Sequence, residues 1–189
     1  SWLLESNKLN VDSFINLKIY IYIESGGVNM ERIALKSLTG PLNETEEKSA
    51  PPFVYIEGNT NLMLDGPRVS IVGSRKFSLY GKEVCEKIIA GLKGYPIAIV
   101  SGFAMGIDTI AHKKAIEVGL KTLVFPGSGL SDEAMYPKTN VSFIKKVIES
   151  GGCLISEFEP DFKATHWSFP MRNRLMAGIS KAVLIIEAE

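Results

Sequence analysis

The sequence has few of the residues that build disulfide frameworks and metal centres. Its 189 residues include only two cysteines and two histidines. Cys85 and Cys153 each lie within an apolar pattern, so we expect both to be reduced core residues of a cytoplasmic protein. His112 has no companion at the spacing that a metal site requires. We therefore expect neither a metal nor a cofactor.

An excess of charge of one sign is also missing. The chain carries 21 basic and 21 acidic side chains, which gives a formal net charge of zero. Proteins that bind nucleic acid over a broad basic surface are usually more basic than this. If the chain binds nucleic acid, its positive charge must be concentrated locally.

Long hydrophobic runs are absent as well. No stretch of 18 apolar residues is present, and the first residues lack the pattern of a signal peptide, so no membrane association is expected. The composition, 46% hydrophobic and 22% charged, is nevertheless rich enough for a packed core. The length suits one ordinary domain with a small appendage.

From Val69 onward, short apolar runs alternate with amphipathic segments. Near-continuous apolar strands that alternate with helices predict an α/β fold, specifically a Rossmann-like, doubly wound and mostly parallel sheet with helices on both faces. The predicted strands are Val69–Val72, Ile97–Val100, Leu120–Phe125, Cys153–Ser156 and Ala182–Ile186, and the predicted helices are Ser78–Leu92, Ile107–Val118, Thr139–Ser150 and Arg172–Ile179. The sequence stops directly after the last strand, so we expect a fragment truncated at the C-terminus.

The first 50 residues differ from the rest and form a small N-terminal segment of uncertain fold, whereas residues 51–189 form the Rossmann-like domain. This division falls at Pro51-Pro52. The predicted features around it are a strand-like run at Phe14–Ile23, a short helix at Asn29–Leu38, an acidic linker at Asn43–Lys48 and a strand at Phe53–Glu57.

Two apolar strands run straight into glycine-containing turns and then into helices, at Val69–Arg75 and Ile99–Asp108. Glycine lets the backbone approach an anion, and a helix N-terminus offers unpaired N–H groups at the positive end of its dipole. Ser74 and Arg75 add hydroxyl and guanidinium donors. The pattern points to a nucleotide or a nucleic-acid backbone as the ligand, and G-x-G-x-x-G, the dinucleotide fingerprint, is absent.

The helix after the second turn carries two polar groups four residues apart. Asp108 falls in the first helical turn, where a carboxylate caps N–H groups, and we expect it to be structural. His112 lies on the same helical face, within reach of Asp108, and we expect it to be structural rather than catalytic.

The segment Ser168–Arg174 is the best candidate for local positive charge. Arg172 and Arg174 lie at the opening of a predicted helix and are placed to face phosphates. Phe169 or Trp167 offers a ring on which a base can stack. Guanidinium groups beside an aromatic ring suit single-stranded nucleic acid.

A structural role for these arginines is the alternative. Arg174 can pair with Glu157 or Glu187 inside the fold, and we expect at least one of the two arginines to be structural. Lys163 and His166, in the preceding loop, would add positive charge to the rim.

The order of the motifs resembles the DNA-processing protein A (DprA/Smf) family. The resemblance covers about Pro52 to Glu189 and rests on Val69–Arg75, Ser101–Asp108 with Ala111-His112, Gly129-Leu130 with Tyr136-Pro137, Ile155–Phe158, and Phe169–Ser180. It implies an extended Rossmann-like domain that binds single-stranded DNA, acts in natural transformation, loads RecA recombinase and forms a homodimer, without enzymatic turnover.

The resemblance and the loop chemistry together give one set of candidate phosphate- and DNA-binding residues. These are Gly73, Ser74, Arg75, Lys76, Ser101, Gly102, Phe103, Gly106, Lys163, Phe169, Arg172, Asn173 and Arg174. No catalytic residue is predicted, because G-x-S-x-G, C-x-x-C and paired Cys–His motifs are absent.

Two alternative functions use the same phosphate cradle. One is a nucleoside-monophosphate phosphoribohydrolase of the related LOG type. Pro126–Leu130 begins like that family's P-G-G-x-G-T-x-x-E motif but lacks its threonine, and Glu133 falls one residue early. The other is a small-nucleotide-binding protein without turnover.

Overall fold

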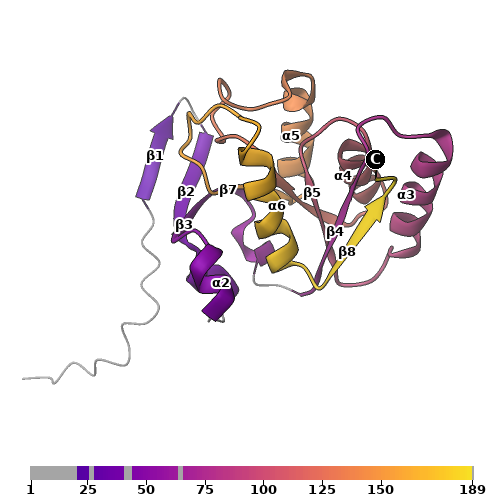
Figure 1. The fold of residues 1–189 in the computed structure, drawn as a ribbon, viewed down its shortest axis with the longest axis horizontal. Coiled ribbons are helices and arrows are strands. Elements are labelled where there is room, and N and C mark those ends of the chain that lie inside the picture. Colours follow the sequence, from indigo (N-terminus) through magenta and orange to yellow (C-terminus); the bar gives the residue numbers. More distant parts are fainter. Residues whose placement is uncertain (1–20, 26–27, 41–43, 64–65, 189) are drawn as a thin grey trace, which may run out of the picture.

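The computed structural model describes residues 21–25, 28–40, 44–63 and 66–188, whose strands form one eight-stranded sheet (Figure 1). The strands are β1 Ile21–Ser25, β2 Val28–Ala34, β3 Phe53–Gly58, β4 Arg68–Gly73, β5 Ala98–Gly102, β6 Lys121–Phe125, β7 Cys153–Ser156 and β8 Ala182–Ile186. The helices are α1 Leu35–Thr39, α2 Glu44–Ser49, α3 Leu79–Gly91, α4 Ile107–Glu117, α5 Val141–Glu149 and α6 Ser168–Ile179, with 3-10 turns at Thr60–Met63 and Lys138–Asn140. None of these helices is long and apolar enough to span a bilayer.

The strand order is β1-β2-β3-β7-β6-β5-β4-β8. The five strands from β7 to β8 are parallel to their neighbours, and β1, β2 and β3 extend the sheet in antiparallel fashion. The predicted Rossmann-like, mostly parallel α/β architecture is confirmed. Each strand and helix predicted from Phe53 to Ile186 is present, although α6 begins at Ser168 rather than at Arg172.

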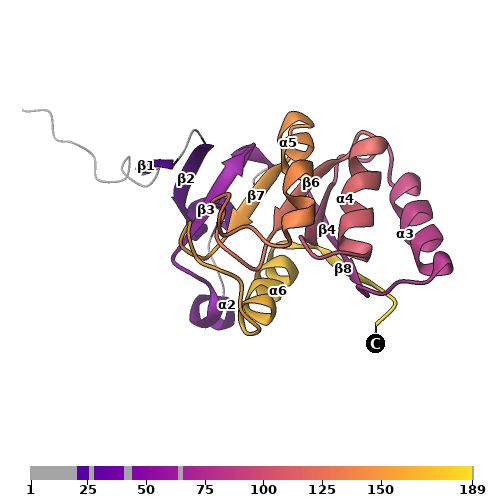
Figure 2. The same cartoon turned by 90° about the horizontal axis from the view of Figure 1, so that it is seen from above.

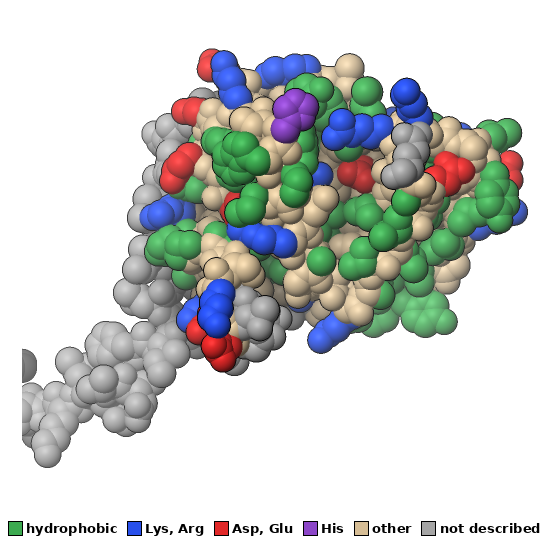
Figure 3. Space-filling model, viewed as in Figure 1, with side chains coloured by type: hydrophobic (Ala, Val, Ile, Leu, Met, Phe, Trp, Pro, Cys, Tyr) green, Lys and Arg blue, Asp and Glu red, His purple; other side chains and the backbone are tan. Residues whose placement is uncertain are grey.

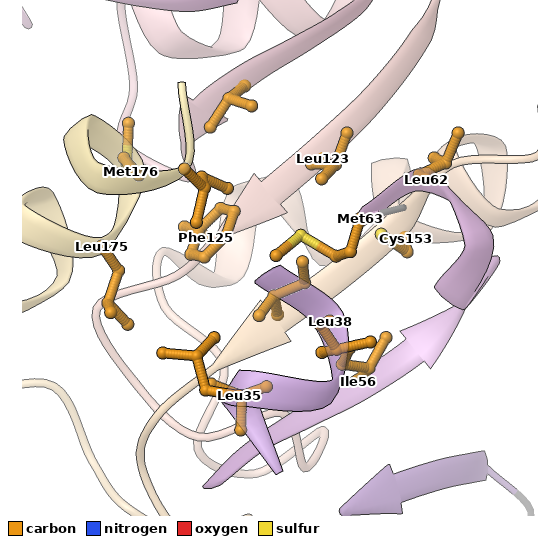
Figure 4. Packing of buried hydrophobic residues seen from close by; sticks show 14 of the residues in the cluster. Leu35, Leu38, Ile56, Leu62, Met63, Leu123, Phe125, Cys153, Leu175 and Met176 are labelled. Atoms are coloured by element: carbon orange, nitrogen blue, oxygen red, sulfur yellow. The ribbon is translucent and has the colours of Figure 1, made fainter. Parts of the chain in front are cut away.

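Helices cover both faces of the sheet, with α3, α4 and α5 on one face and α2 and α6 on the other (Figure 2). Because successive strand residues point to opposite faces, Ile99 packs against α3 and α4 while Val100 packs toward α1 and α6. Figure 4 shows the second of these cores, in which Leu35 of α1 and Leu175 of α6 approach the strand residue Phe125. Burial on both faces explains why the central strands are continuously apolar.

The predicted helix at Asn29–Leu38 is wrong over most of its length, because residues 28–34 form β2. Met30 and Ile33 are spaced three apart, as on one face of a helix. In the strand they point to opposite faces, and each is buried in a different core, on either side of the sheet. Pairing of β2 with β3 outweighs the helical pattern.

The acidic run at Asn43–Lys48 was expected to be a linker, but residues 44–49 form α2. Glutamate and lysine are good helix formers, and the pair Glu44–Lys48 at i,i+4 is 2.8 Å apart. Asn43 and most of the predicted run Phe14–Ile23 lie outside the described residues; its last three residues belong to β1. The predicted division at residue 50 falls between α2 and β3, and β2 and β3 pair across it.

The sheet reverses its winding direction at β4. From β4 the chain proceeds through α3 to β5 on one side, whereas β8 pairs with β4 on the other side. The crossover helices α3 and α6 lie on opposite faces (Figure 2). In such sheets the carboxyl ends of the two strands at the reversal flank a crevice where ligands bind.

Candidate nucleic-acid interface

A cavity of about 630 Å³ opens at the carboxyl ends of β4 and β8. The turn after β4 contributes Gly73, Ser74, Arg75 and Lys76, while α6 and β8 supply further polar and apolar lining side chains, including Phe169, Arg172, Asn173, Met176, Val183 and Ile185. Its volume lies in the usual range for ligand sites. The fold therefore brings two predicted binding segments to one cavity. They are the turn after β4 and the segment Ser168–Arg174, called the arginine segment below.

Arg75 is exposed and is held in place by an aromatic ring. Its guanidinium carbon lies 5.4 Å from the centre of the Phe169 ring, and that of Arg172 lies 5.9 Å from the same centre. A cation over an aromatic face is stabilised by the ring quadrupole. Within the described residues the Arg75 guanidinium makes no ion pair or hydrogen bond, so its donors remain available to a ligand.

Arg172, by contrast, is 6% exposed and has internal partners. It donates hydrogen bonds to the carbonyl oxygen of Phe125 and, over 2.9 Å, to the side-chain oxygen of Asn173. Burial lowers the pKa of its guanidinium, and the nearby Asp108 carboxylate opposes that shift. Arg172 therefore supports the cavity floor. It contributes positive potential to the cavity rather than N–H groups that are free to bind a ligand.

Asp108, in the first turn of α4, is buried and lines the inner part of the cavity. Burial raises the pKa of its carboxyl to about 6, although Arg172 and backbone hydrogen bonds from Ala104 and Gly73 favour the charged form. The carboxylate thus uses backbone N–H groups of the two glycine-containing turns, which were expected to bind a phosphate. The Ile107 N–H of the same turn donates to the Ser74 carbonyl oxygen at 3.2 Å.

The N-terminus of α3 also holds a carboxylate of the chain. Glu187, which follows β8, accepts hydrogen bonds from the backbone N–H of Ser78 at 2.7 Å and from the Ser78 hydroxyl. These two hydrogen bonds lower the pKa of Glu187. Carboxylates of the chain thus bind the N–H of Ser78 before α3 and those of Gly73 and Ala104 in the two turns, and the unpaired cations Arg75 and Lys76 remain for an anionic ligand.

His112 is buried and does not contact Asp108. Its two ring nitrogens lie 2.6 Å from the Thr122 hydroxyl and 2.6 Å from the Gly102 carbonyl oxygen. Burial lowers the pKa of the imidazole to about 4. A neutral histidine whose two ring nitrogens both have hydrogen-bond partners has the structural role that the sequence predicted. No group of three metal-ligating side chains occurs among the described residues.

The glycine-rich turn before α4 lies under the surface rather than forming an open cradle. Ser101, Gly102 and Phe103 are buried, and the Ser101 hydroxyl donates to the Ile71 carbonyl oxygen at 2.5 Å. Gly106 has φ of +91°, and a Cβ there would lie 2.7 Å from the Cα of Arg75. This turn therefore serves as the base on which the Arg75 turn rests.

The remaining predicted residues fall into two groups. Arg174 forms an ion pair with Glu157 at 2.6 Å and faces away from the large cavity, as the structural alternative predicted for one of the arginines. Asn173 and Lys163 are exposed. Asn173 lines the large cavity, and Lys163 lies in the loop that precedes α6.

Trp167 is the exposed ring just before the arginine segment, with 55% of its surface accessible. It packs against two other aromatic rings, since its ring centre lies 5.7 Å from that of Phe158 and 5.5 Å from that of Phe162. On the face seen in Figure 3, hydrophobic and basic side chains are interspersed around a histidine near the upper rim. Such a mixture is the kind of surface that stacks bases and neutralises phosphates.

The family model described as DNA recombination-mediator protein A matches residues 35–189. The chain belongs to this family. It is 38% identical over 149 residues to the DNA processing protein DprA of Streptococcus pneumoniae, covering 79% of this chain and 51% of that protein. It is 35% identical over 138 residues to Protein Smf of Escherichia coli, covering 73% of this chain and 36% of that protein.

Two solved structures of the family share the fold. The S. pneumoniae DprA structure matches with a TM-score of 0.67 and 38% identity, covering 74% of this chain and 48% of that one. The Helicobacter pylori DNA processing protein A, described for its unique single-stranded DNA binding mode, matches with a TM-score of 0.69 and 27% identity, covering 84% and 69%. The chain spans about half the length of its pneumococcal relative and about a third of the E. coli one.

Sequence reasoning did not select three residues that shape this site. Glu187 was considered as a partner of Arg174, whereas it accepts hydrogen bonds from Ser78 at the start of α3. Tyr136 and Met105 are 53% and 55% exposed, respectively, and line a shallow hollow together with Arg75. The available signal for Tyr136 was an aromatic residue between two apolar ones, in the loop that follows the strand ending at Phe125.

Proposed function

We propose that this chain binds single-stranded DNA at the carboxyl edge of its parallel strands. One observation carries the proposal: an exposed, unpaired Arg75 is fixed over Phe169 at the mouth of a cavity of about 630 Å³. A cation held in one orientation loses little freedom when it binds a phosphate, so more of the interaction contributes to affinity. Family membership and the H. pylori relative's described binding mode support the same ligand.

In this proposal Arg75, Lys76 and the amide of Asn173 contact successive phosphates, and Lys163 adds a cation to the rim. Phe169 holds Arg75 in position, and the buried Arg172 adds positive potential next to it. Ser74 has its hydroxyl bonded within its own turn, to the Lys76 carbonyl oxygen at 2.9 Å and from the Lys76 N–H at 3.0 Å. It therefore shapes the turn.

Bases stack on exposed aromatic rings. Both guanidinium groups lie over the Phe169 ring, so Trp167 is the more open of the two rings that the sequence offered. Stacking on a protein ring contributes on the order of 1–3 kcal/mol per base and requires an unpaired base. A duplex should therefore bind less well than a single strand.

We extend the proposal to the role that the family resemblance implies: action in natural transformation, loading of RecA recombinase, a homodimer and a cytoplasmic location, with binding rather than turnover. The second candidate is the binding of a free mononucleotide, because the cavity has the volume of a small-ligand site. A phosphoribohydrolase is the weaker alternative, since the motif threonine is missing.

The Arg75→Ala substitution tests the proposed site. Loss of this guanidinium removes a charge-assisted hydrogen bond, so we expect binding of a labelled oligo-dT to weaken at least tenfold, about 1.4 kcal/mol. Fluorescence anisotropy at low salt measures the affinity, and circular dichroism confirms that the variant is folded.

Lys93→Ala is the matched control. Lys93 is an exposed cation just beyond α3, whose 13 residues separate it by about 20 Å from the Ser78 end. Its removal should leave affinity within about twofold. Equal loss in both variants would mean diffuse electrostatic binding, whereas tight binding of a mononucleotide without binding of oligo-dT would favour the second candidate.

A further inference from the structure

Arg75 and Phe169 stand between two hollows. On one side lies the large cavity at the carboxyl ends of β4 and β8. On the other side lies a shallow hollow of about 30 Å³ that shares Arg75, Ala104, Phe169 and Arg172 with the cavity. Its remaining lining residues are Phe103, Met105, Gly127, Tyr136 and Pro137. A strand that reaches Arg75 from the cavity therefore meets Tyr136 and Met105 if it continues.

Tyr136 is held so that its ring must face outward. The residues on either side of it, Met135 and Pro137, are buried, whereas Tyr136 itself is 53% exposed. The segment is tied to the turn before α4, because the Asn140 side chain donates to the Phe103 carbonyl oxygen at 3.0 Å and to the Thr109 hydroxyl at 3.0 Å. These bonds hold the backbone segment that carries the ring before any ligand arrives.

The neighbouring groups fit a base. Met105 is 55% exposed beside Tyr136, and thioethers make favourable contacts with aromatic rings. Within the described residues the Tyr136 hydroxyl has no hydrogen-bond partner. The hollow has room for about one water molecule, so a flat ring must lie across it rather than inside it.

We infer that Tyr136 is a second base-stacking position, which takes an unstacked nucleobase whose phosphate lies against Arg75. The single strand then passes over the ridge that Arg75 and Phe169 form, with nucleotides bound on both sides of it. This inference rests on the proposed single-stranded DNA binding and adds the path of the strand. The neutral ring and thioether select an uncharged, planar group.

The test compares Tyr136→Ala with Tyr136→Phe in anisotropy titrations with labelled oligo-dT. Loss of one stacked base should weaken binding by about tenfold in Tyr136→Ala, whereas Tyr136→Phe keeps the ring and should stay within about twofold of the wild type. Tyr95→Ala is the matched control, because Tyr95 is 63% exposed and precedes β5 at the opposite edge of the sheet. Its removal should leave the affinity unchanged.

An oligonucleotide of abasic nucleotides separates stacking from other effects. On this probe Tyr136→Ala and the wild type should bind equally, while Arg75→Ala should still bind more weakly. If Tyr136→Ala binds oligo-dT as the wild type does while Arg75→Ala loses affinity, the inference fails and the proposed function stands. Equal loss on both probes would also overturn stacking, and unchanged binding by Arg75→Ala would overturn the proposed function itself.

Discussion

Asp108 and His112 are both buried in α4, and burial shifts their pKa values in opposite directions. The pKa of Asp108 is raised to about 6, so its folded state retains a proton that the unfolded chain releases near pH 4. The pKa of His112 is lowered to about 4, so its folded state stays neutral where the unfolded chain is already protonated below about pH 6.5. As pH falls from 7 to 4, Asp108 adds stability and His112 removes it, and the two contributions offset each other.

The Asp108→Asn substitution should expose the histidine's contribution. The variant lacks the stability that Asp108 gains on protonation, so acidification from pH 7 to 4.5 should lower its free energy of unfolding, relative to the wild type, by on the order of 1–3 kcal/mol. Urea denaturation at both pH values measures this difference. A difference between variant and wild type that does not change with pH would show that Asp108 titrates as an ordinary exposed carboxyl.

At the scale of elements, two turns are stacked at the carboxyl edge, and glycine makes the contact possible. Gly106 has φ of +91°, a conformation that L side chains rarely adopt, and a Cβ there would lie 2.7 Å from the Arg75 Cα. The turn before α4 therefore fixes the position of the Arg75 turn, so a change at the buried Gly106 should affect the proposed DNA-binding surface.

Gly106→Ala should destabilise the fold by on the order of 1–3 kcal/mol through backbone strain. It should also weaken oligo-dT binding, because the Arg75 turn must move away. Gly91→Ala is the control, since Gly91 ends α3 with open space around it and alanine favours helix. Thermal and urea unfolding report the stability, and a Gly106→Ala variant as stable as Gly91→Ala would contradict this account.

Much of the element pattern could be predicted because central parallel strands are apolar throughout and their helices are amphipathic. The error at Met30 and Ile33 arose because their spacing fits one helical face and also two faces of a strand, and only pairing with β3 decides between them. The site was predictable as a set of loops at one edge. The burial of Arg172 and the hydrogen bonds from Ser78 to Glu187 depend on contacts between distant segments, which no local pattern shows.

At the scale of the whole molecule, charge is balanced, and the chain's own carboxylates, Asp108 and Glu187, bind several backbone N–H groups at this edge. Few cations remain free at and beside the cavity, so the proposal involves about three neutralised phosphates, which pair with Arg75, Lys76 and the rim residue Lys163. A single strand gives a slope of log affinity against log salt of about −0.7 per neutralised phosphate, or about −2 for three. A broad basic surface would give a much steeper dependence.

The most direct test is the salt dependence of oligo-dT binding, measured by fluorescence anisotropy for the wild type and for Arg75→Ala. The account predicts a wild-type slope near −2, at least tenfold weaker binding by the variant at low salt, and a slope that is shallower by about 0.7 in the variant. Identical affinities and slopes for the two folded proteins, or no binding by the wild type at low salt, would contradict it.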